Sequence, residues 1–170
     1  FIEQTNAAWS SGDVFSVFEA ALAEFGYDRI CYSLITAHPS LGLKAGHGVM
    51  RNYPEDWMKH YIANDYVKKD PVPRNCFFSS SPFTWTEVTN SGRLSHEQLR
   101  VMNESQDAKL FDGIAVPFHG INGELAGVGI ASSTGGVQPD RLMLHKIGAM
   151  AAQFHLAYTE KETRFDHVKS

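Results

Sequence analysis

Two β-prone runs separated by one tight turn constrain the fold of this chain more than any other feature. Residues 113–119 and 124–132 read GIAVPFH and ELAGVGIAS, and Gly120-Ile121-Asn122-Gly123 joins them. An Asn-Gly pair between two such runs is a strong hairpin signal, because both residues tolerate the left-handed backbone that tight hairpin turns require. We therefore expect an antiparallel hairpin here, and with it a mostly antiparallel sheet.

Helical and strand patterns elsewhere in the chain do not alternate, which argues against a parallel α/β fold. Apolar residues recur at helical spacing over residues 13–25 and 139–159, and a capping box that begins at Ser95 opens a helix over residues 96–110. Pro54 suits the first position of one more helix. The remaining strand candidates, expected to pair antiparallel with each other, are residues 28–36 and 44–50. This order of elements predicts an α+β domain.

The two faces of the predicted sheet differ in the size of their side chains. Alternation places the bulky Val128 and Ile130 on one face. The small residues that alternation can place together on the other face are Cys31, Ser33, Ala115, Gly127, Gly129 and Ala131. Residues 29–36 are largely apolar in both alternating sets, so we expect helices on both faces of the sheet. A face of small residues either receives a closely packed helix or forms the floor of a ligand cavity, and the sequence leaves both open.

Composition and charge exclude several classes of function. The 170 residues, 43% of them hydrophobic, supply the core of one domain, and no apolar run reaches the roughly 18 residues of a membrane helix. A net charge of −4 without any basic cluster argues against nucleic-acid binding by this piece. Cys31 and Cys76 have no zinc-site spacing, and no two of the eight histidines are spaced as metal ligands. We expect a cytoplasmic protein without a metal or another cofactor.

Aromatic residues and one carboxylate gather within residues 52–72. Tyr53, Trp57 and Tyr61 fall at i, i+4 spacing, and Asp70 precedes Pro71. Trp can only donate hydrogen bonds, Tyr can donate or accept, and an ionised carboxylate only accepts. The set therefore complements a neutral amide or ester ligand that has two carbonyl groups and one N–H. The alternative is an ordinary amphipathic helix with an aromatic core face and an exposed turn residue at position 70.

Ordered motifs give the chain a resemblance to a known family. They are Tyr53-Pro54-x-x-Trp57 with Tyr61 following, Asp70-Pro71, Pro82-Phe83-x-Trp85, and Pro117-x-His119-Gly120-x-x-Gly123-Glu124-Leu125. Their order and spacing closely resemble the N-terminal autoinducer-binding domain of LuxR-type quorum-sensing regulators, over most of residues 13–160. The resemblance implies an α/β/α sandwich around a five-stranded antiparallel sheet. It also implies that an N-acyl-homoserine lactone lies buried between the sheet and the helices of one face.

The resemblance also implies domain limits and residue roles. Residues 1–160 form the autoinducer-binding domain, and residues 161–170 begin a linker towards a missing C-terminal helix-turn-helix domain. Trp57 matches the donor to the lactone carbonyl, Tyr53 the donor to the acyl amide carbonyl, and Asp70 the acceptor of the amide N–H. The other residues that we expect around the ligand are Tyr61, Trp85, Ser33, Ala115 and Gly129. The chain begins at Phe1 without Met, and we expect it to be a piece of a longer protein.

The sequence thus predicts a non-enzymatic ligand-sensing domain of a bacterial transcription regulator. Lactone binding would be coupled to folding, to formation of a homodimer, and to DNA binding by the absent domain. Gly129 departs from the family, where Ser or Thr stands near the acyl carbonyl, and its small size enlarges the expected pocket. Gly148, Ala149 and Ala152 beside the apolar stripe of the last helix favour the homodimer. Two alternatives stay open: an amidohydrolase or acyltransferase using Asp70 with a His and a Cys, and a GAF- or PAS-like sensor of another ligand.

Overall fold

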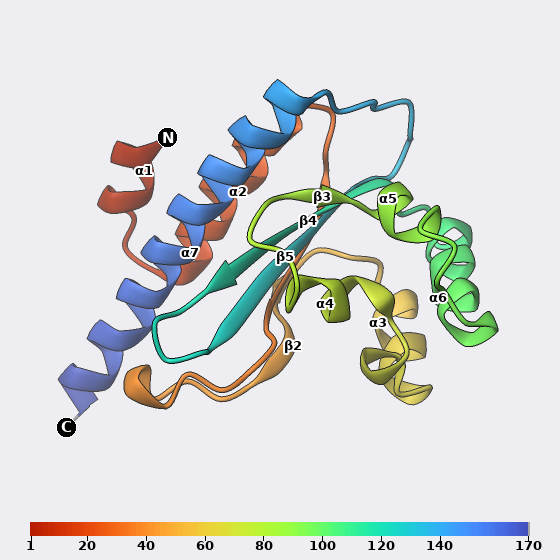
Figure 1. Ribbon diagram of the computed structural model, residues 1–170. Helices are drawn as coiled ribbons and strands as arrows, with labels where there is room; N and C mark the ends of the chain where they lie inside the picture. Colours follow the sequence, from red (N-terminus) through yellow and green to blue (C-terminus); the bar gives the residue numbers. More distant parts are fainter. Residues whose placement is uncertain (170) are drawn as a thin grey trace.

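A five-stranded antiparallel sheet forms the middle layer of the molecule (Figure 1). The structure is a computed structural model that describes residues 1–169, and the side chains of residues 1–163. The strands lie in the order β2-β1-β5-β4-β3. Their bounds are β1 Arg29–Leu34, β2 Gly46–Arg51, β3 Phe83–Thr84, β4 Phe111–His119 and β5 Leu125–Ser132. The predicted hairpin is β4 and β5, and the predicted pairing of the first two strands is confirmed.

Three helices cover the face of the sheet that carries bulky side chains. They are α1 (Ile2–Ala7), α2 (Ser11–Ala23) and α7 (Arg141–Lys169). The rings of Phe18 on α2 and Phe154 on α7 stack with their centroids 4.8 Å apart, and Tyr32 on β1 meets Phe154 edge to face. These rings belong to the largest buried apolar cluster, which includes Ile30, Val128 and Ile130. This layer is therefore a conventional hydrophobic core.

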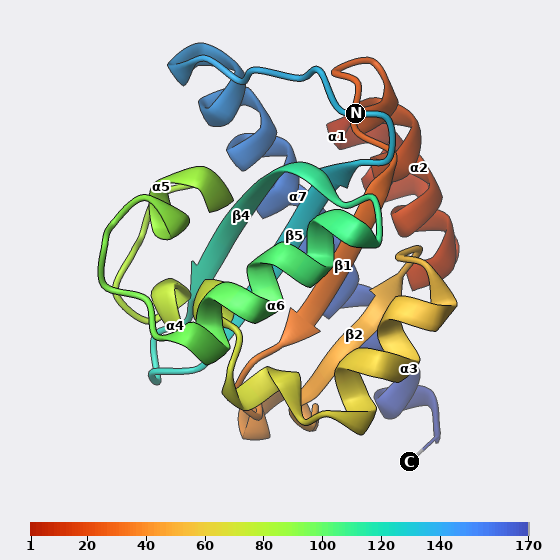
Figure 2. The same ribbon diagram turned by 90° about the vertical axis from the view of Figure 1, so that its right-hand side faces the viewer.

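Four shorter helices cover the other face. They are α3 (Glu55–Ala63), α4 (Pro71–Cys76), α5 (Trp85–Thr89) and α6 (His96–Asp107), with short 3₁₀ turns at Pro39–Leu41 and Tyr66–Lys68. Figure 2 shows α6 running across the front of β4, β5 and β1, with α3 beside β2. Helices on both faces confirm the predicted α/β/α arrangement.

The sheet register aligns the small residues of this second face. Cys31 on β1 pairs with Gly129 on β5, and Gly129 pairs with Ala115 on β4. In the next row of the same face, Ser33 pairs with Gly127. Small side chains from three adjacent strands therefore adjoin one another. They leave the space between the sheet and the helices of this layer unfilled.

The predicted strands lie within two residues of the observed ones at each end, whereas the helices differ more. Helix α2 begins and ends two residues earlier than predicted, α6 ends at Asp107, and Pro54 is the N-cap of α3 and not its first helical residue. The capping box of Ser95 and Gln98 is confirmed. Helices α1, α4 and α5 and strand β3 were not predicted, because segments of two to six residues are too short to show a period.

Helix α7 runs across the boundary that we expected at residue 160. It continues to Lys169, whereas the sequence predicts a helix that ends near residue 159. The side chains of residues 164–170 lie outside the described part of the chain, so the predicted linker over residues 161–170 stays a prediction.

Candidate ligand-binding site

A cavity of about 330 Å³ lies between the small-residue face of the sheet and helices α3 to α6. This volume is within the range of pockets that hold small molecules. All eight residues predicted to surround a ligand line it: Ser33, Tyr53, Trp57, Tyr61, Asp70, Trp85, Ala115 and Gly129. The small-residue face of the sheet therefore forms the floor of a cavity and does not receive a closely packed helix. That these residues contact a ligand stays a prediction.

Two glycines let large side chains approach the sheet closely. A Cβ atom at Gly129 would lie 2.7 Å from Tyr53 Oη and 3.6 Å from Trp85 Cζ2. At Gly113 a Cβ atom would lie 1.9 Å from Trp85 Cδ2, so the indole lies directly over the backbone of β4. Gly129, one of the small residues expected in the floor of a ligand cavity, lies beneath the hydroxyl of Tyr53.

Two hydrogen-bond donors in the cavity wall have no partner in the part of the chain that the structure describes. Tyr53 Oη and Trp85 Nε1 are buried, and neither atom makes a hydrogen bond within the described residues. Burial raises the pKa of Tyr53 well above its usual value, so its hydroxyl keeps its proton and is available as a donor. Leaving such a buried group unsatisfied costs about 1–3 kcal/mol, which a ligand with acceptor oxygens at these places would recover.

Asp70 supplies an acceptor to the same cavity. It is the N-cap of α4, with the extended backbone that Pro71 favours, and its Oδ1 accepts a hydrogen bond of 2.9 Å from Val72 N. Tyr61 Oη donates to Oδ2 at 2.8 Å. Burial raises the pKa of Asp70 to about 6 against the opposing effect of these two bonds. An ionised carboxylate accepts about four hydrogen bonds, so Asp70 can still accept one from a ligand N–H.

His47 on β2 also lines the cavity, and the sequence did not predict it. Its ring stacks on Tyr61 with centroids 4.4 Å apart and an angle of 10° between the planes. Its Nδ1 lies 3.2 Å from Ser33 Oγ, and its Nε2 lies 3.8 Å from Cys31 Sγ. Burial, helped by nearby Arg51, lowers the pKa of His47 to about 4, so the imidazole is neutral at pH 7.

The rest of the cavity wall is largely apolar. Helix α6 contributes Val101 and Met102, and the region of α4 contributes Val72 and Cys76. A Cβ atom at Gly127 would lie 3.2 Å from Ile35 Cδ1 and 3.5 Å from Cys76 Sγ, which marks the apolar part of the floor. Such a wall suits a hydrocarbon chain attached to a polar head group.

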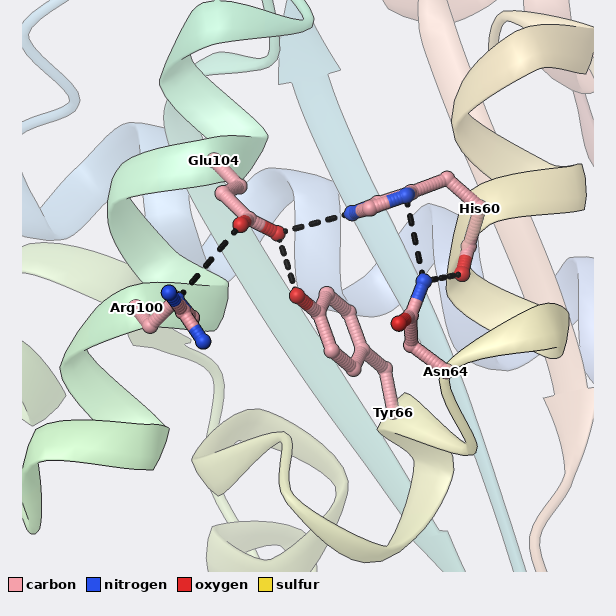
Figure 3. A network of polar contacts seen from close by, with 5 residues as sticks. All are labelled: His60, Asn64, Tyr66, Arg100 and Glu104. Atoms are coloured by element: carbon pink, nitrogen blue, oxygen red, sulfur yellow. Dashed lines mark hydrogen bonds and ion pairs between the residues drawn. The ribbon is translucent and has the colours of Figure 1, made fainter.

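A polar network fastens α6 over the cavity (Figure 3). Glu104 on α6 accepts hydrogen bonds from Tyr66 Oη and, at 2.9 Å, from His60 Nε2, which belongs to α3. Arg100 Nε lies 3.8 Å from the other carboxylate oxygen, and Asn64 donates to His60. Although partial burial opposes it, the hydrogen bonds from Tyr66 and His60 hold the pKa of Glu104 below its usual value. The network therefore ties the helix that carries Val101 and Met102 to the opposite wall.

Other classes of site find no support in the described part of the chain. Within it, no three His, Cys, Asp or Glu side chains gather as metal ligands. None of its helices combines the length and the apolar character needed to cross a membrane.

Comparison with known proteins gives a family match over most of the chain. The model of the autoinducer binding domain matches residues 10–158. The transcriptional activator protein BjaR1 of Bradyrhizobium diazoefficiens is 33% identical over 141 residues, which are 82% of this chain and 55% of that protein. The chain spans about half the length of the curated relatives that it matches.

Solved structures share the fold at low sequence identity. Escherichia coli SdiA has a TM-score of 0.75 at 18% identity, over 93% of this chain and 64% of that one. CepR2 of Burkholderia cenocepacia, described as an N-acylhomoserine lactone dependent transcription factor, has a TM-score of 0.69 at 17% identity, over 95% and 91% of the two chains. At these identities the likeness concerns the fold alone.

Proposed function

The chain belongs to the autoinducer-binding domain family of LuxR-type quorum-sensing regulators, and from this premise we propose that its cavity binds an N-acyl-homoserine lactone. Family membership favours this function over that of a GAF- or PAS-like sensor of another ligand. The observation that carries the proposal is the set of polar atoms left free around the cavity. Tyr53 Oη and Trp85 Nε1 are donors without partners among the described residues, and Asp70 is an acceptor that can take one more hydrogen bond.

An acyl-homoserine lactone has one N–H and two carbonyl groups, which match Asp70 and Tyr53 of this set together with Trp57, another residue of the cavity wall. Its amide N–H would donate to Asp70, its amide carbonyl would accept from Tyr53, and its ring carbonyl would accept from Trp57. Tyr61 and Trp85 would wall the head group, with Gly129 giving Tyr53 the room it needs. The acyl chain would lie against the apolar wall, which includes side chains of α4 and α6.

The bound lactone would complete the core between the sheet and α3 to α6. A ligand that binds only the folded state stabilises it by about 2.7 kcal/mol at a concentration one hundred times its Kd. Sensing would then be coupled to folding, to homodimer formation in the cytoplasm, and to DNA binding by a domain outside these residues. Relatives described as transcriptional activators support this role.

The proximity of His47 to Cys31 favours the alternative function, that of an amidohydrolase or acyltransferase. Asp70, His47 and Cys31 line one cavity, and His47 Nε2 lies 3.8 Å from Cys31 Sγ. A cysteine nucleophile needs a thiolate, but burial raises the pKa of Cys31 to about 12, and His47 has too low a pKa to draw its proton. The electrostatics therefore favour binding without catalysis.

Mass spectrometry separates the two functions. The chain is expressed with N-hexanoyl-homoserine lactone, purified, denatured and extracted, and a second sample is incubated with excess lactone. The proposal expects intact lactone at about one molecule per chain and no consumption of the excess. An acid or amine product formed in proportion to protein concentration and abolished by Cys31→Ala would favour the enzyme instead.

A further inference from the structure

One imidazole, that of His47, lies in the cavity wall among the described residues. His47 projects from β2 between Tyr61 of α3, on which it stacks, and Ser33 and Cys31 of β1. Tyr61 Oη in turn donates to Asp70. One aromatic ring therefore separates the imidazole from the carboxylate that would hold the ligand amide.

The hydrogen bonds around Ser33 fix where the imidazole proton lies. Gly48 N donates to Ser33 Oγ at 2.8 Å. Two acceptors are within reach of the Ser33 hydroxyl proton among the described residues: His47 Nδ1, at 3.2 Å, and the sulfur of Cys31, which also makes a hydrogen bond with Ser33. If Nδ1 carried the proton instead, Ser33 would accept two hydrogen bonds, and its own proton would have only the weakly accepting sulfur of Cys31 as a partner among the described residues. The favoured neutral imidazole therefore carries its proton on Nε2.

The Nε2–H donor is poorly satisfied by the protein. Its partner among the described residues is Cys31 Sγ at 3.8 Å, and a thiol sulfur is a weak acceptor. The charged group that acts on the ring is Arg51, which disfavours its protonation, while Asp70 lies on the far side of Tyr61. An oxygen atom that entered from the cavity would be a better acceptor than the sulfur.

We propose that His47 donates a hydrogen bond from Nε2 to an oxygen on the acyl chain of the ligand, close to its amide. The cavity would thereby select N-acyl-homoserine lactones that carry an oxo or hydroxyl group near the amide over those with a plain hydrocarbon chain. This inference rests on the proposed function and adds the class of acyl chain to it.

The test compares two ligands of equal length, N-(3-oxohexanoyl)- and N-hexanoyl-homoserine lactone. For the unaltered chain we expect the oxo compound to have a Kd about tenfold lower, as one added hydrogen bond of ordinary strength provides. His47→Phe keeps a ring to stack on Tyr61 and removes the donor, so the ratio of the two Kd values should fall to about one. His96→Phe, at an exposed imidazole in the first turn of α6, is the matched control and should keep the original ratio.

The outcomes distinguish this inference from the proposed function. Equal Kd values for both lactones in the unaltered chain, or an unchanged ratio in His47→Phe, would overturn the role of His47 while leaving lactone binding in place. Failure of both lactones to bind would overturn the proposed function itself. Nitrogen NMR of the chain bound to the oxo compound is independent of any variant: we expect a protonated Nε2 on His47, and an unprotonated Nε2 would contradict the inference.

Discussion

At the scale of single residues, Asp70 has two conflicting requirements. It must be ionised to accept a ligand N–H, yet its position in the cavity wall deprives the carboxylate of water and raises its pKa to about 6. Moving the pKa of a carboxyl group from 3.8 to about 6 on folding corresponds to about 3 kcal/mol of destabilisation once the group is ionised. This destabilisation is present in the unliganded chain, and a ligand that donates a hydrogen bond to the carboxylate would reduce it.

The pH dependence of stability follows from that shift. The folded state of the unliganded chain binds the Asp70 proton more tightly than the unfolded state does. Proton binding at Asp70 therefore stabilises the folded state fully below pH 4, and this stabilisation is lost as the pH rises through about 6. We expect Asp70→Asn to remove this decline between pH 4 and pH 6, measured by urea unfolding without ligand. Asp56→Asn, an exposed carboxylate of α3, is the control and should keep the decline. A parallel decline in Asp70→Asn would contradict the assignment.

Tyr53 and Tyr27 offer a matched pair of buried hydroxyls. Tyr53 Oη has no partner among the described residues, whereas Tyr27 Oη donates to Asp112 O at 3.0 Å. We expect Tyr53→Phe to leave the free energy of unfolding of the unliganded chain unchanged or higher, and Tyr27→Phe to lower it by about 1 kcal/mol. Lactone affinity should fall in Tyr53→Phe, by less than in Asp70→Asn, because water can still serve the amide carbonyl. Calorimetry measures both quantities, and a large loss of unliganded stability in Tyr53→Phe would show that its hydroxyl has a protein partner.

Which residues the sequence could predict depended on how regular their backbone is. Trp57 and Tyr61 lie one turn apart on α3, and Tyr53 comes just before its N-cap, so the sequence spacing of the three residues could predict that they lie together. His47 lies in a strand whose register with β1 shifts between Tyr32 and Leu34, and Gly48 beside it has a φ of 63°. Simple alternation fails across such an irregularity, and the direction of the imidazole could not be derived from it.

At the scale of elements, α6 forms one wall of the cavity and is fixed by the capping box at its N-terminus and by the contacts of Glu104. It begins at the capping box of Ser95 and contributes Val101 and Met102 to the cavity, while Glu104 joins it to α3 and to Tyr66 (Figure 3). The capping box was predictable because it is a local pattern of four residues. The Glu104 contacts were not, since they join residues about forty positions apart.

Removing the charge of Glu104 should loosen this wall. We expect Glu104→Gln to lower the free energy of unfolding by about 1–2 kcal/mol at pH 7, because bonds to a charged acceptor are replaced by weaker ones. Lactone dissociation should be faster in the variant by stopped-flow measurement. The pKa of Glu104 is lowered in the folded state. The difference in the free energy of unfolding between Glu104→Gln and the unaltered chain should therefore be present at pH 7 and disappear as the pH falls through that pKa.

A second carboxylate of α6 controls for this variant. Glu97 is exposed in the first turn of the same helix, and Glu97→Gln should leave the dissociation rate unchanged. Equal dissociation rates in Glu104→Gln and the unaltered chain would show that α6 does not limit the exit of the ligand.

At the scale of the whole molecule, α7 presents a stripe for the homodimer that we propose. Leu142 and Leu156 are 63% and 57% exposed, and Ala149 and Ala152 lie exposed between them. Gly148, which the sequence grouped with these residues, is different: a Cβ atom there would lie 2.5 Å from Pro82 Cγ, so it packs against its own chain.

A charge on this stripe should weaken the dimer. We expect Ala152→Glu to shift the liganded chain from dimer towards monomer in sedimentation velocity at tens of micromolar, because a charge would be buried at the interface. Gln106→Glu adds the same charge on the exposed side of α6 and should sediment as the unaltered chain does. A liganded chain that is monomeric before any substitution would refute dimer formation through these residues.

The most direct test of lactone binding in the cavity is thermal unfolding of this chain with N-hexanoyl-homoserine lactone and with its ring-opened acid. The lactone should raise the Tm progressively with the logarithm of its concentration, corresponding to about 2.7 kcal/mol at one hundred times its Kd, and the acid should do so far less. Asp70→Asn and Trp57→Phe should each lose most of the response to the lactone. An unchanged Tm in the unaltered chain, or an equal rise in all three chains, would contradict binding at this site.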